Sequence, residues 1–153
     1  MKLIILSKGQ TTKIDDEDFE KLSKHSWYLN NHGYVVSGCK KRILMHREVV
    51  VAKPFPENEV DHINGDRLDN RKLNLRVCTR NENAKNRRAY KCNTSGFKGV
   101  FYEKDTINHW GAKIRVNTKL INLGFFESKE EAAVIYDKAA IKYFGEFATL
   151  NIN

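Results

Sequence analysis

Short apolar stretches separated by turn-forming residues dominate the first part of the chain. This alternation is typical of small hairpins, because short strands are apolar on one face and Gly and Asn permit the tight turns between them. The apolar stretches lie at residues 3–6, 27–29 and 34–36, and the turn residues at 8–9, 30–33 and 38. We therefore expect a β-rich platform from Lys2 to about Met45.

Two short helices are predicted within and just after this platform. Asp15 or Asp16 is a suitable cap for a helix over residues 15–24. A second helix is expected over residues 46–52, because the residue before Pro54 is disfavoured in the helical conformation.

The middle of the chain has the pattern strand, turn, strand, helix. Thr79 followed three residues later by Glu82 is a capping box, which marks the start of a helix. Gly65 suits the tight turn. The strands are expected at residues 60–63 and 76–78, the turn at 64–66 and the helix at 79–87.

The last part of the chain predicts three strands followed by one amphipathic helix. Ser128 with Glu131 is a second capping box, and apolar residues recur at helical spacing from Ala132 to Tyr143, before Gly145. The strands are expected at residues 97–102, 109–116 and 120–126. The predicted result is a three-stranded antiparallel sheet packed on one helix.

These elements predict an α+β protein of two small domains. The first, residues 1–90, holds the platform and the motif at 60–88, and the second spans residues 97–153. A linker at residues 91–96 is expected between them. A chain of 153 residues is long enough for two such domains, each with a small core.

Composition narrows the class of partner. The 27 Lys and Arg residues outnumber the 19 Asp and Glu residues, so the net charge of +8 favours a polyanion such as nucleic acid. No apolar run is long enough to span a membrane, which excludes a membrane partner at this stage. The 3 Cys residues form no C-x-x-C pair, so we expect free thiols in a reducing cytoplasm.

The positive charge is concentrated in the first domain. Residues 1–92 hold 19 Lys and Arg against 12 Asp and Glu, whereas residues 93–153 hold 8 against 7. The densest segment indicates a surface that faces phosphates, although a solvated helix face is the simpler alternative. Its basic residues are Arg76, Arg80, Lys85, Arg87, Arg88 and Lys91, with Glu82 as the one acid among them.

Three side chains of the middle block suit hydrolysis of a phosphodiester. Asp61 offers a charged oxygen ligand and Asn83 a neutral one for a hard divalent cation, and His62 suits a general base. A helix packed across the hairpin can bring Asn83 to face Asp61. Strand alternation, however, points Asp61 and His62 to opposite faces unless the backbone twists there. By itself an Asp-His pair is more often structural.

The longer string of residues is more specific. It resembles the HNH endonuclease motif, in the version found in phage and intron homing endonucleases. The matching residues are 60–66, 70–71, 74–76 and 81–83. The resemblance implies a metal-dependent DNA endonuclease with a ββα-metal fold and one Mg²⁺ or Mn²⁺ in each active site. It implies that His62 is the general base, that Asp61 and Asn83 are metal ligands, and that Asn74 orients the base or braces the loop.

Two positions need comment within this resemblance. The last His of the family motif is an Asn here, and Asn83 competes for that position with its neighbours Asn81 and Asn86. His46 resembles a residue that recurs ahead of the motif in such chains, and we interpret it as structural.

The last domain resembles the Apetala-type (AP2/ERF-like) DNA-binding domain of plant transcription factors, which also occurs attached to HNH nucleases. The matching residues are 96–100, 110–115, 123–126 and 130–140, and the resemblance covers residues 94–153. In that family the sheet reads DNA and the helix supports it. The resemblance therefore implies that Lys98, Trp110, Lys113 and Arg115 contact DNA.

The residues themselves leave an alternative open for this domain. A module with a net charge of +1 also suits protein interaction or packing. Lys113 and Arg115, at two-residue spacing, project to one side of a strand, as major-groove contacts require. Phe101 and Asn122 depart from the plant pattern, so base preference does not carry over.

We therefore predict a metal-dependent endonuclease that cuts double-stranded DNA at a recognised site, as a homing-type nicking or double-strand-cutting enzyme. We expect a monomer in the cytoplasm of a bacterial host, encoded by a phage. Two alternatives are a DNA-binding regulator without cleavage activity and an RNA-binding or structural protein. The first predicts a missing ligand or base, and the second predicts stacking aromatic residues on an open sheet.

Overall fold

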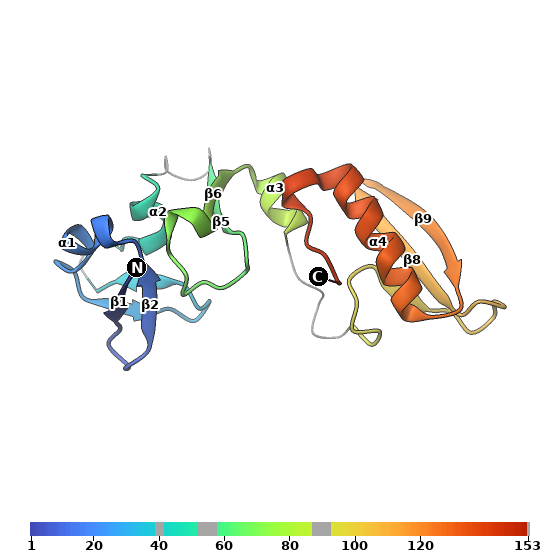
Figure 1. Cartoon of the computed structure of the whole chain (residues 1–153), viewed down its shortest axis with the longest axis horizontal. Helices are drawn as coiled ribbons and strands as arrows, with labels where there is room; N and C mark the ends of the chain where they lie inside the picture. The colour runs from blue at the N-terminus through green and yellow to red at the C-terminus, as the bar shows by residue number, and fades with distance from the viewer. Residues whose placement is uncertain (39–41, 52–57, 87–92, 153) are drawn as a thin grey trace. The chain divides into compact units, whose positions relative to one another are not determined.

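Antiparallel hairpins and short helices make up the structure, a computed structural model that describes residues 1–38, 42–51, 58–86 and 93–152. The chain divides into two compact units, Met1–Asn83 and Ala84–Asn153 (Figure 1). Helices combined with small antiparallel sheets confirm the α+β class. The predicted boundary and its linker at residues 91–96 stay a prediction, because residues 87–92 lie outside the described part.

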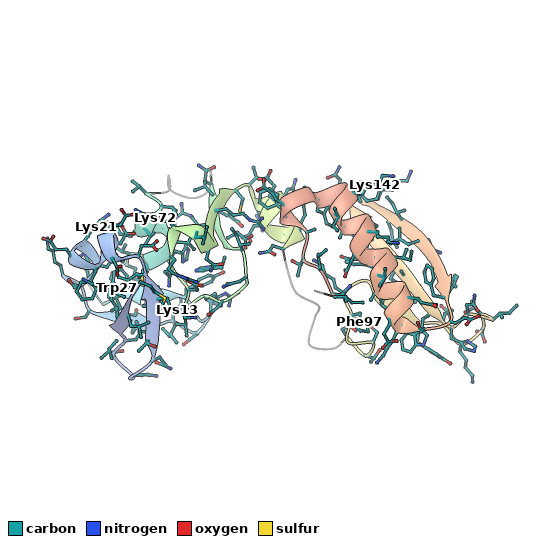
Figure 2. The ribbon with its side chains drawn as sticks, viewed as in Figure 1. Lys13, Lys21, Trp27, Lys72, Phe97 and Lys142 are labelled. Carbon is teal, nitrogen blue, oxygen red and sulfur yellow. The ribbon has the colours of Figure 1, made fainter. Side chains whose placement is uncertain are left out.

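Two hairpins form the β-rich platform predicted for the first unit. β1 (Lys2–Ile5) pairs with β2 (Thr11–Ile14), and β3 (Trp27–Leu29) pairs with β4 (Val35–Ser37), both antiparallel. Their inward side chains belong to one apolar core. Trp27 is buried in it, and its indole N–H donates to the carbonyl of Leu22 at 2.8 Å (Figure 2), which satisfies the polar end of a buried ring.

The first predicted helix is shorter than expected. Residues 15–24 form a 3-10 turn (Asp16–Asp18) and then α1 (Phe19–Leu22). Asp15 stands at the N-cap of the 3-10 turn, as one of the two predicted caps, but its side chain makes no capping hydrogen bond. The Asp15 carboxylate accepts instead from the backbone N–H of Lys72 at 2.7 Å, and Asp16 pairs with the N-terminal ammonium group.

The middle block has the predicted order of strand, turn, strand and helix. Its elements, with the helix before them, are α2 (Met45–Val49), β5 (Glu59–His62), the 3-10 turn η2 (Lys72–Asn74), β6 (Leu75–Cys78) and α3 (Arg80–Lys85). The capping box is confirmed: the Glu82 N–H donates to Thr79 Oγ1 at 3.3 Å, and the Glu82 carboxylate accepts from the Thr79 N–H at 2.8 Å. The helix ends at Lys85, before the predicted end at Arg87, which itself lies outside the described residues.

The second unit is a three-stranded antiparallel sheet with one helix across one face (Figure 1). Its elements are β7 (Val100–Tyr102), β8 (Trp110–Val116), β9 (Lys119–Phe126), α4 (Lys129–Phe144) and a 3-10 turn (Gly145–Phe147). The predicted cap of α4 is confirmed, since Ser128 Oγ accepts from the Glu131 N–H at 3.1 Å. Within the described residues, no helix is long and apolar enough to cross a membrane.

The end of the second unit is tied back to its beginning. Asp137 is buried, and its carboxylate accepts from the backbone N–H groups of Asn151 and Ile152, both at 2.9 Å. The Asn151 side chain then bonds to the backbone of Lys98. These contacts hold the segment before β7 against α4.

Gly99 explains why the first strand of this sheet begins at Val100 rather than at the predicted residue 97. Its φ of +77° is a conformation that other residues rarely adopt. A Cβ atom here would also lie 2.1 Å from the Tyr136 ring and 2.7 Å from the Lys113 carbonyl oxygen. Only glycine lets the chain pass under α4 at this point.

Replacing Gly99 by Ala should therefore destabilise the second unit more than backbone strain alone. Gly96 is a matched control, because its φ is +81° but nothing lies within 4 Å of its Cβ position. We expect Gly96→Ala to cost about 1 kcal/mol and Gly99→Ala about 2 kcal/mol more, from overpacking. Urea unfolding of the two variants measures the difference, and equal losses would contradict this explanation.

Candidate functional site

Strand β5 presents two different surfaces. The antiparallel register places Asp61 opposite Arg76 and His62 opposite Leu75. Adjacent side chains on a strand point to opposite faces. Asp61 and His62 are both buried, but they contact different neighbours, and their contacts follow the ordinary alternation of a strand.

The Asp61 face of β5 is polar. The guanidinium group of Arg76 donates to Asp61 Oδ2 from Nη2 at 2.7 Å and from Nε at 3.0 Å. Both bonds are charge-assisted and converge on one carboxylate oxygen. Arg76, the first basic residue of the predicted phosphate-facing segment, therefore contacts Asp61 directly.

Asn83 lies against the same polar face. Its Nδ2 donates to Glu59 Oε2 at 2.5 Å, and Glu59 stands two residues before Asp61 on β5. Asn81 is exposed, and Asn86 accepts from the Thr149 hydroxyl at 2.7 Å within the second unit. Of the three candidate Asn residues, Asn83 makes a hydrogen bond to a side chain of β5. Sequence reasoning missed Glu59, although the two-residue spacing to Asp61 places both on one face.

His62 lies on the other face of β5, packed among polar and aromatic side chains. Its Nε2 is 3.2 Å from Asn70 Oδ1. Burial lowers the pKa of the His62 imidazole, while the hydrogen bond to Asn70 and the charge of Asp61 oppose that shift. The ring is therefore neutral at neutral pH, the state that a general base needs.

Two aromatic rings pack around His62. The ring of His46 meets it edge-on with centroids 5.1 Å apart, and Tyr34 lies 5.1 Å from His46 and 6.2 Å from His62. His46 is 5% exposed, and its Nδ1 has no hydrogen-bond partner among the described residues. This packing agrees with the structural interpretation of His46 and also places it against the predicted base.

Asn74 holds the loop between β5 and β6. Its Oδ1 accepts from the Asn64 N–H at 3.0 Å, and its Nδ2 donates to the Asp69 carbonyl at 2.8 Å. The Asp69 carboxylate in turn accepts from Asn64 Nδ2 and from Arg71. These contacts suit the bracing role rather than direct contact with His62.

Two of the predicted DNA-contacting residues are exposed on strand β8. Lys113 and Arg115 are exposed on β8, while Ala112 and Ile114 between and beside them are buried under α4, so both basic side chains lie on the sheet face away from the helix. The Lys113 ammonium sits 4.2 Å from the centroid of the Phe101 ring on that face.

Trp110 and Lys98 have other surroundings. Trp110 shares the alternation of Ala112 and packs partly against the core beneath α4. Lys98 is partly buried, its ammonium donates to the Lys85 carbonyl at 2.7 Å, and burial lowers its pKa to about 8. Arg80 is exposed, and Arg87 and Arg88 lie outside the described residues.

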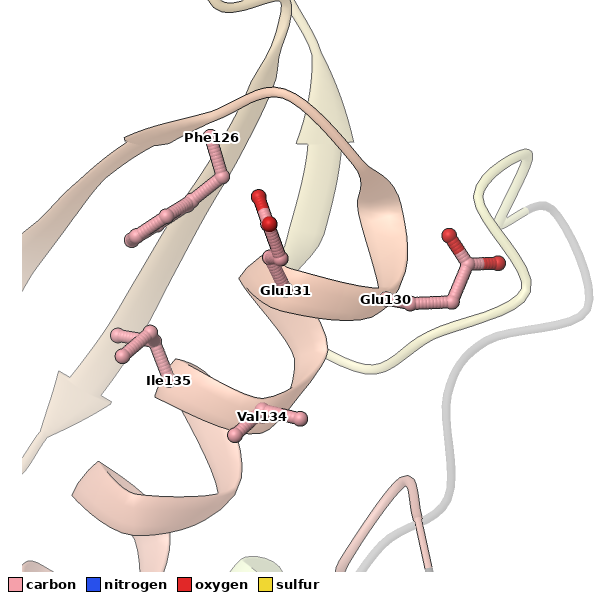
Figure 3. A pocket seen from close by; sticks show the side chains of 5 residues that line it. All are labelled: Phe126, Glu130, Glu131, Val134 and Ile135. Carbon is pink, nitrogen blue, oxygen red and sulfur yellow. The ribbon is translucent and has the colours of Figure 1, made fainter.

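A separate surface pocket of about 400 Å³ lies on the second unit, where β9 leads into α4 (Figure 3). Phe126, Val134 and Ile135 form its apolar walls, and Glu130 points away from Phe126 and Ile135. None of the predicted catalytic, metal or DNA-contacting residues lines it.

Comparison with known proteins gives one match to a family and several relatives. The HNH endonuclease family model matches residues 44–85. An uncharacterized HNH endonuclease of Acanthamoeba polyphaga mimivirus is 32% identical over 148 residues, which cover 94% of this chain and 76% of that protein. Protein 3.8 of Escherichia phage T7 is 32% identical over 96 residues, 62% of this chain and 78% of that protein.

A plant protein is similar over a shorter stretch. An AP2/ERF and B3 domain-containing transcription factor of Arabidopsis thaliana is 48% identical over 50 residues, 33% of this chain and 14% of that factor. No solved structure matches the chain.

The buried His46 makes the stability of the first unit depend on pH. Burial, with the charges of His62, Arg47 and Arg67, lowers its pKa from 6.5 to about 3. Between pH 6.5 and pH 3 the unfolded chain binds a proton at His46 that the native chain does not. The contribution of His46 to the free energy of unfolding is therefore present above pH 6.5 and is lost as the pH falls. We expect a loss of about 2 kcal/mol between pH 7 and pH 5 from this residue.

Urea unfolding at the two pH values checks this expectation. His46→Phe removes the titrating group and keeps the ring packing. The difference in the free energy of unfolding between pH 7 and pH 5 should therefore shrink by about 2 kcal/mol. The same pH dependence in wild type and variant would show that the pKa of His46 is not lowered in the native protein.

Proposed function

The chain belongs to the HNH endonuclease family, which makes it a nuclease, and we propose that it hydrolyses phosphodiester bonds of double-stranded DNA at a recognised site. The proposed reaction uses one divalent metal ion per active site. The proposal extends to a homing-type activity, by nicking or by double-strand cutting. The observation that carries it is the set of contacts at β5. Asn83 contacts Glu59 on the strand face that Asp61 shares, and His62, whose pKa is lowered by burial, follows Asp61 directly.

The chemistry of the polar face fits a hard divalent cation. HNH endonucleases generally use a divalent metal ion. Mg²⁺ prefers one or two carboxylate or amide oxygens from the protein and completes its shell with water and phosphate oxygens. Asn83 donates to Glu59 with its nitrogen, which directs its oxygen away from that contact. In the described part of the chain no three His, Cys, Asp or Glu residues cluster as a metal site.

We assign the ligand role to Asp61 and Asn83, for Mg²⁺ or Mn²⁺. When bound, the ion would neutralise the charge that develops on the scissile phosphate. His62 takes the proton of the attacking water, for which its burial keeps the imidazole neutral. Asn74 keeps the loop after β5 in place through its two backbone contacts. Together these are the catalytic and metal-binding parts of a ββα-metal site.

We propose that the second unit is an Apetala-type domain that binds DNA with its open sheet face. Lys113 and Arg115 are exposed there, and the 48% identity to a plant AP2/ERF factor over 50 residues supports the assignment. The proposed set also includes Lys98 and Trp110, whose present contacts are the Lys85 carbonyl and the core beneath α4, so they would reach DNA from outside the open face. The basic segment would add contacts to the phosphates of the same duplex, through Arg76, Arg80, Lys85, Arg87 and Arg88.

One metal site per chain implies that a monomer cuts one strand at a time. Cys78 is a buried free thiol, which suits a reducing compartment such as the cytoplasm of a bacterial host. The likeness to a phage protein supports a phage origin.

Conversion of a supercoiled plasmid that carries the DNA around the gene tests the proposed function. With Mg²⁺ or Mn²⁺ we expect open circles to appear before linear product, and a chelator to stop the reaction. His62→Ala should lower the cleavage rate by about 100-fold or more, because it removes the general base. His32→Ala, an exposed His of the same unit, is the control and should cut at the wild-type rate.

One outcome would replace the proposal with its alternative. A folded wild-type protein that binds this DNA tightly but leaves it uncut in either metal would be a DNA-binding regulator.

The DNA-binding role of the sheet predicts a change in the salt dependence of affinity. Lys113→Ala or Arg115→Ala should weaken binding and reduce the slope of log K against log salt by about 1 for each phosphate that the native side chain binds. Lys138→Ala is a matched control, because Lys138 is exposed on α4. Equal effects of all three substitutions, measured by fluorescence anisotropy, would exclude the sheet face as the DNA surface.

A further inference from the structure

A buried amide beside His62 has no part in the function described so far. Asn70 is 0% exposed and lies between Thr12, also 0% exposed, and His62. A buried amide must satisfy both its donor and its acceptor end, so its neighbours determine which way it points.

The contacts of Asn70 fix that direction. Its Nδ2 is 2.8 Å from Thr12 Oγ1 and 3.2 Å from the Arg67 carbonyl oxygen. The carbonyl can only accept. The Thr12 hydroxyl donates its hydrogen to the Leu68 carbonyl at 2.8 Å, so its oxygen acts as an acceptor toward Asn70. Both neighbours therefore require the NH₂ group on this side of the amide.

The orientation of Asn70 determines which ring nitrogen of His62 carries the proton. The remaining end of the amide, Oδ1, is 3.2 Å from His62 Nε2. An amide oxygen accepts but cannot donate, so Nε2 must carry the hydrogen of the neutral ring. The other ring nitrogen, Nδ1, then holds the lone pair. The edge-on His46 ring, with centroids 5.1 Å apart, packs against the imidazole in this position.

We propose that Asn70, oriented by Thr12, is a positioning residue that holds His62 in the tautomer with its proton on Nε2 and its basic lone pair on Nδ1. The role of this tautomer in catalysis rests on the proposed nuclease function. Nδ1 takes a proton from water while Nε2–H stays bonded to Asn70, so the ring becomes an imidazolium. The water oxygen bonds to phosphorus, and the bond from phosphorus to the leaving oxygen breaks. The electron pair of that bond stays on the leaving oxygen, which takes a proton from solvent.

Nitrogen-15 NMR of the full-length chain reads the tautomer directly, whether or not the protein cuts DNA. Protonated and unprotonated ring nitrogens give separate signals, and His62 is identified among the 5 His residues by comparison with His62→Ala. At about pH 8, where an imidazole is neutral, we expect one tautomer with the proton on Nε2. A proton on Nδ1 in the wild type would overturn the proposal.

Two sets of variants then test whether the orientation matters. In Asn70→Ala we expect mixed tautomers and a fall of about 10- to 100-fold in the single-turnover rate at saturating DNA, as for other supporting residues, with the DNA dissociation constant within about twofold. Val has nearly the same shape as Thr but lacks the hydroxyl oxygen that accepts from Asn70. Thr12→Val should therefore show the same changes to a smaller degree. Thr12→Ser keeps the hydroxyl and should restore wild-type behaviour.

The outcomes separate this proposal from the nuclease function itself. A wild-type chain that cuts no DNA contradicts the proposed function, and the NMR experiment still decides the tautomer. If Asn70→Ala does not fold, the comparison of Thr12→Val with Thr12→Ser decides. An unchanged tautomer and rate in the folded Asn70 and Thr12 variants would overturn the positioning role.

Discussion

The two-residue period of β5 is the constraint on which the site depends. Asp61 and His62 are neighbours in the sequence, so the pleat sends one side chain to each face of the strand. The His62 face also carries Val60, which packs with Leu75 of β6 in the apolar core of the first unit. A shift of one residue in the pairing would exchange the two faces. The same apolar contacts that stabilise the fold therefore keep the proposed base and the proposed metal ligand on their separate sides.

Directed hydrogen bonds from buried amides complete what the strand begins. A buried amide without partners costs about 1–3 kcal/mol, so each amide has a strong preference for one orientation. Asn74 bonds to the backbone at both ends of the loop after β5, and Asn70 links that loop to His62 and to Thr12 of β2. The loop and the imidazole are therefore held by one set of contacts between three parts of the first unit.

Local patterns predicted the elements better than the contacts between them. The capping boxes at Thr79 and Ser128 marked the starts of α3 and α4, because a cap depends on residues within one turn. The pairing of Asp15 with the backbone near η2, and of Asn70 with β2, joins residues more than fifty positions apart, and no local pattern contains it. Trp110 was expected to contact DNA with Lys113 and Arg115, but it packs partly against the core beneath α4, on the side that Ala112 shares. The predicted roles of the site residues came from a family resemblance rather than from periodicity.

The most direct test of the central claim is the position of the metal. Crystals of the full chain with a DNA duplex and Mn²⁺ would locate the ion by its anomalous scattering. We expect one ion per chain, held by a carboxylate oxygen of Asp61 and the amide oxygen of Asn83, with phosphate and water as the other ligands. An ion bound by His62 and His46, or one that contacts neither Asp61 nor Asn83, would contradict it.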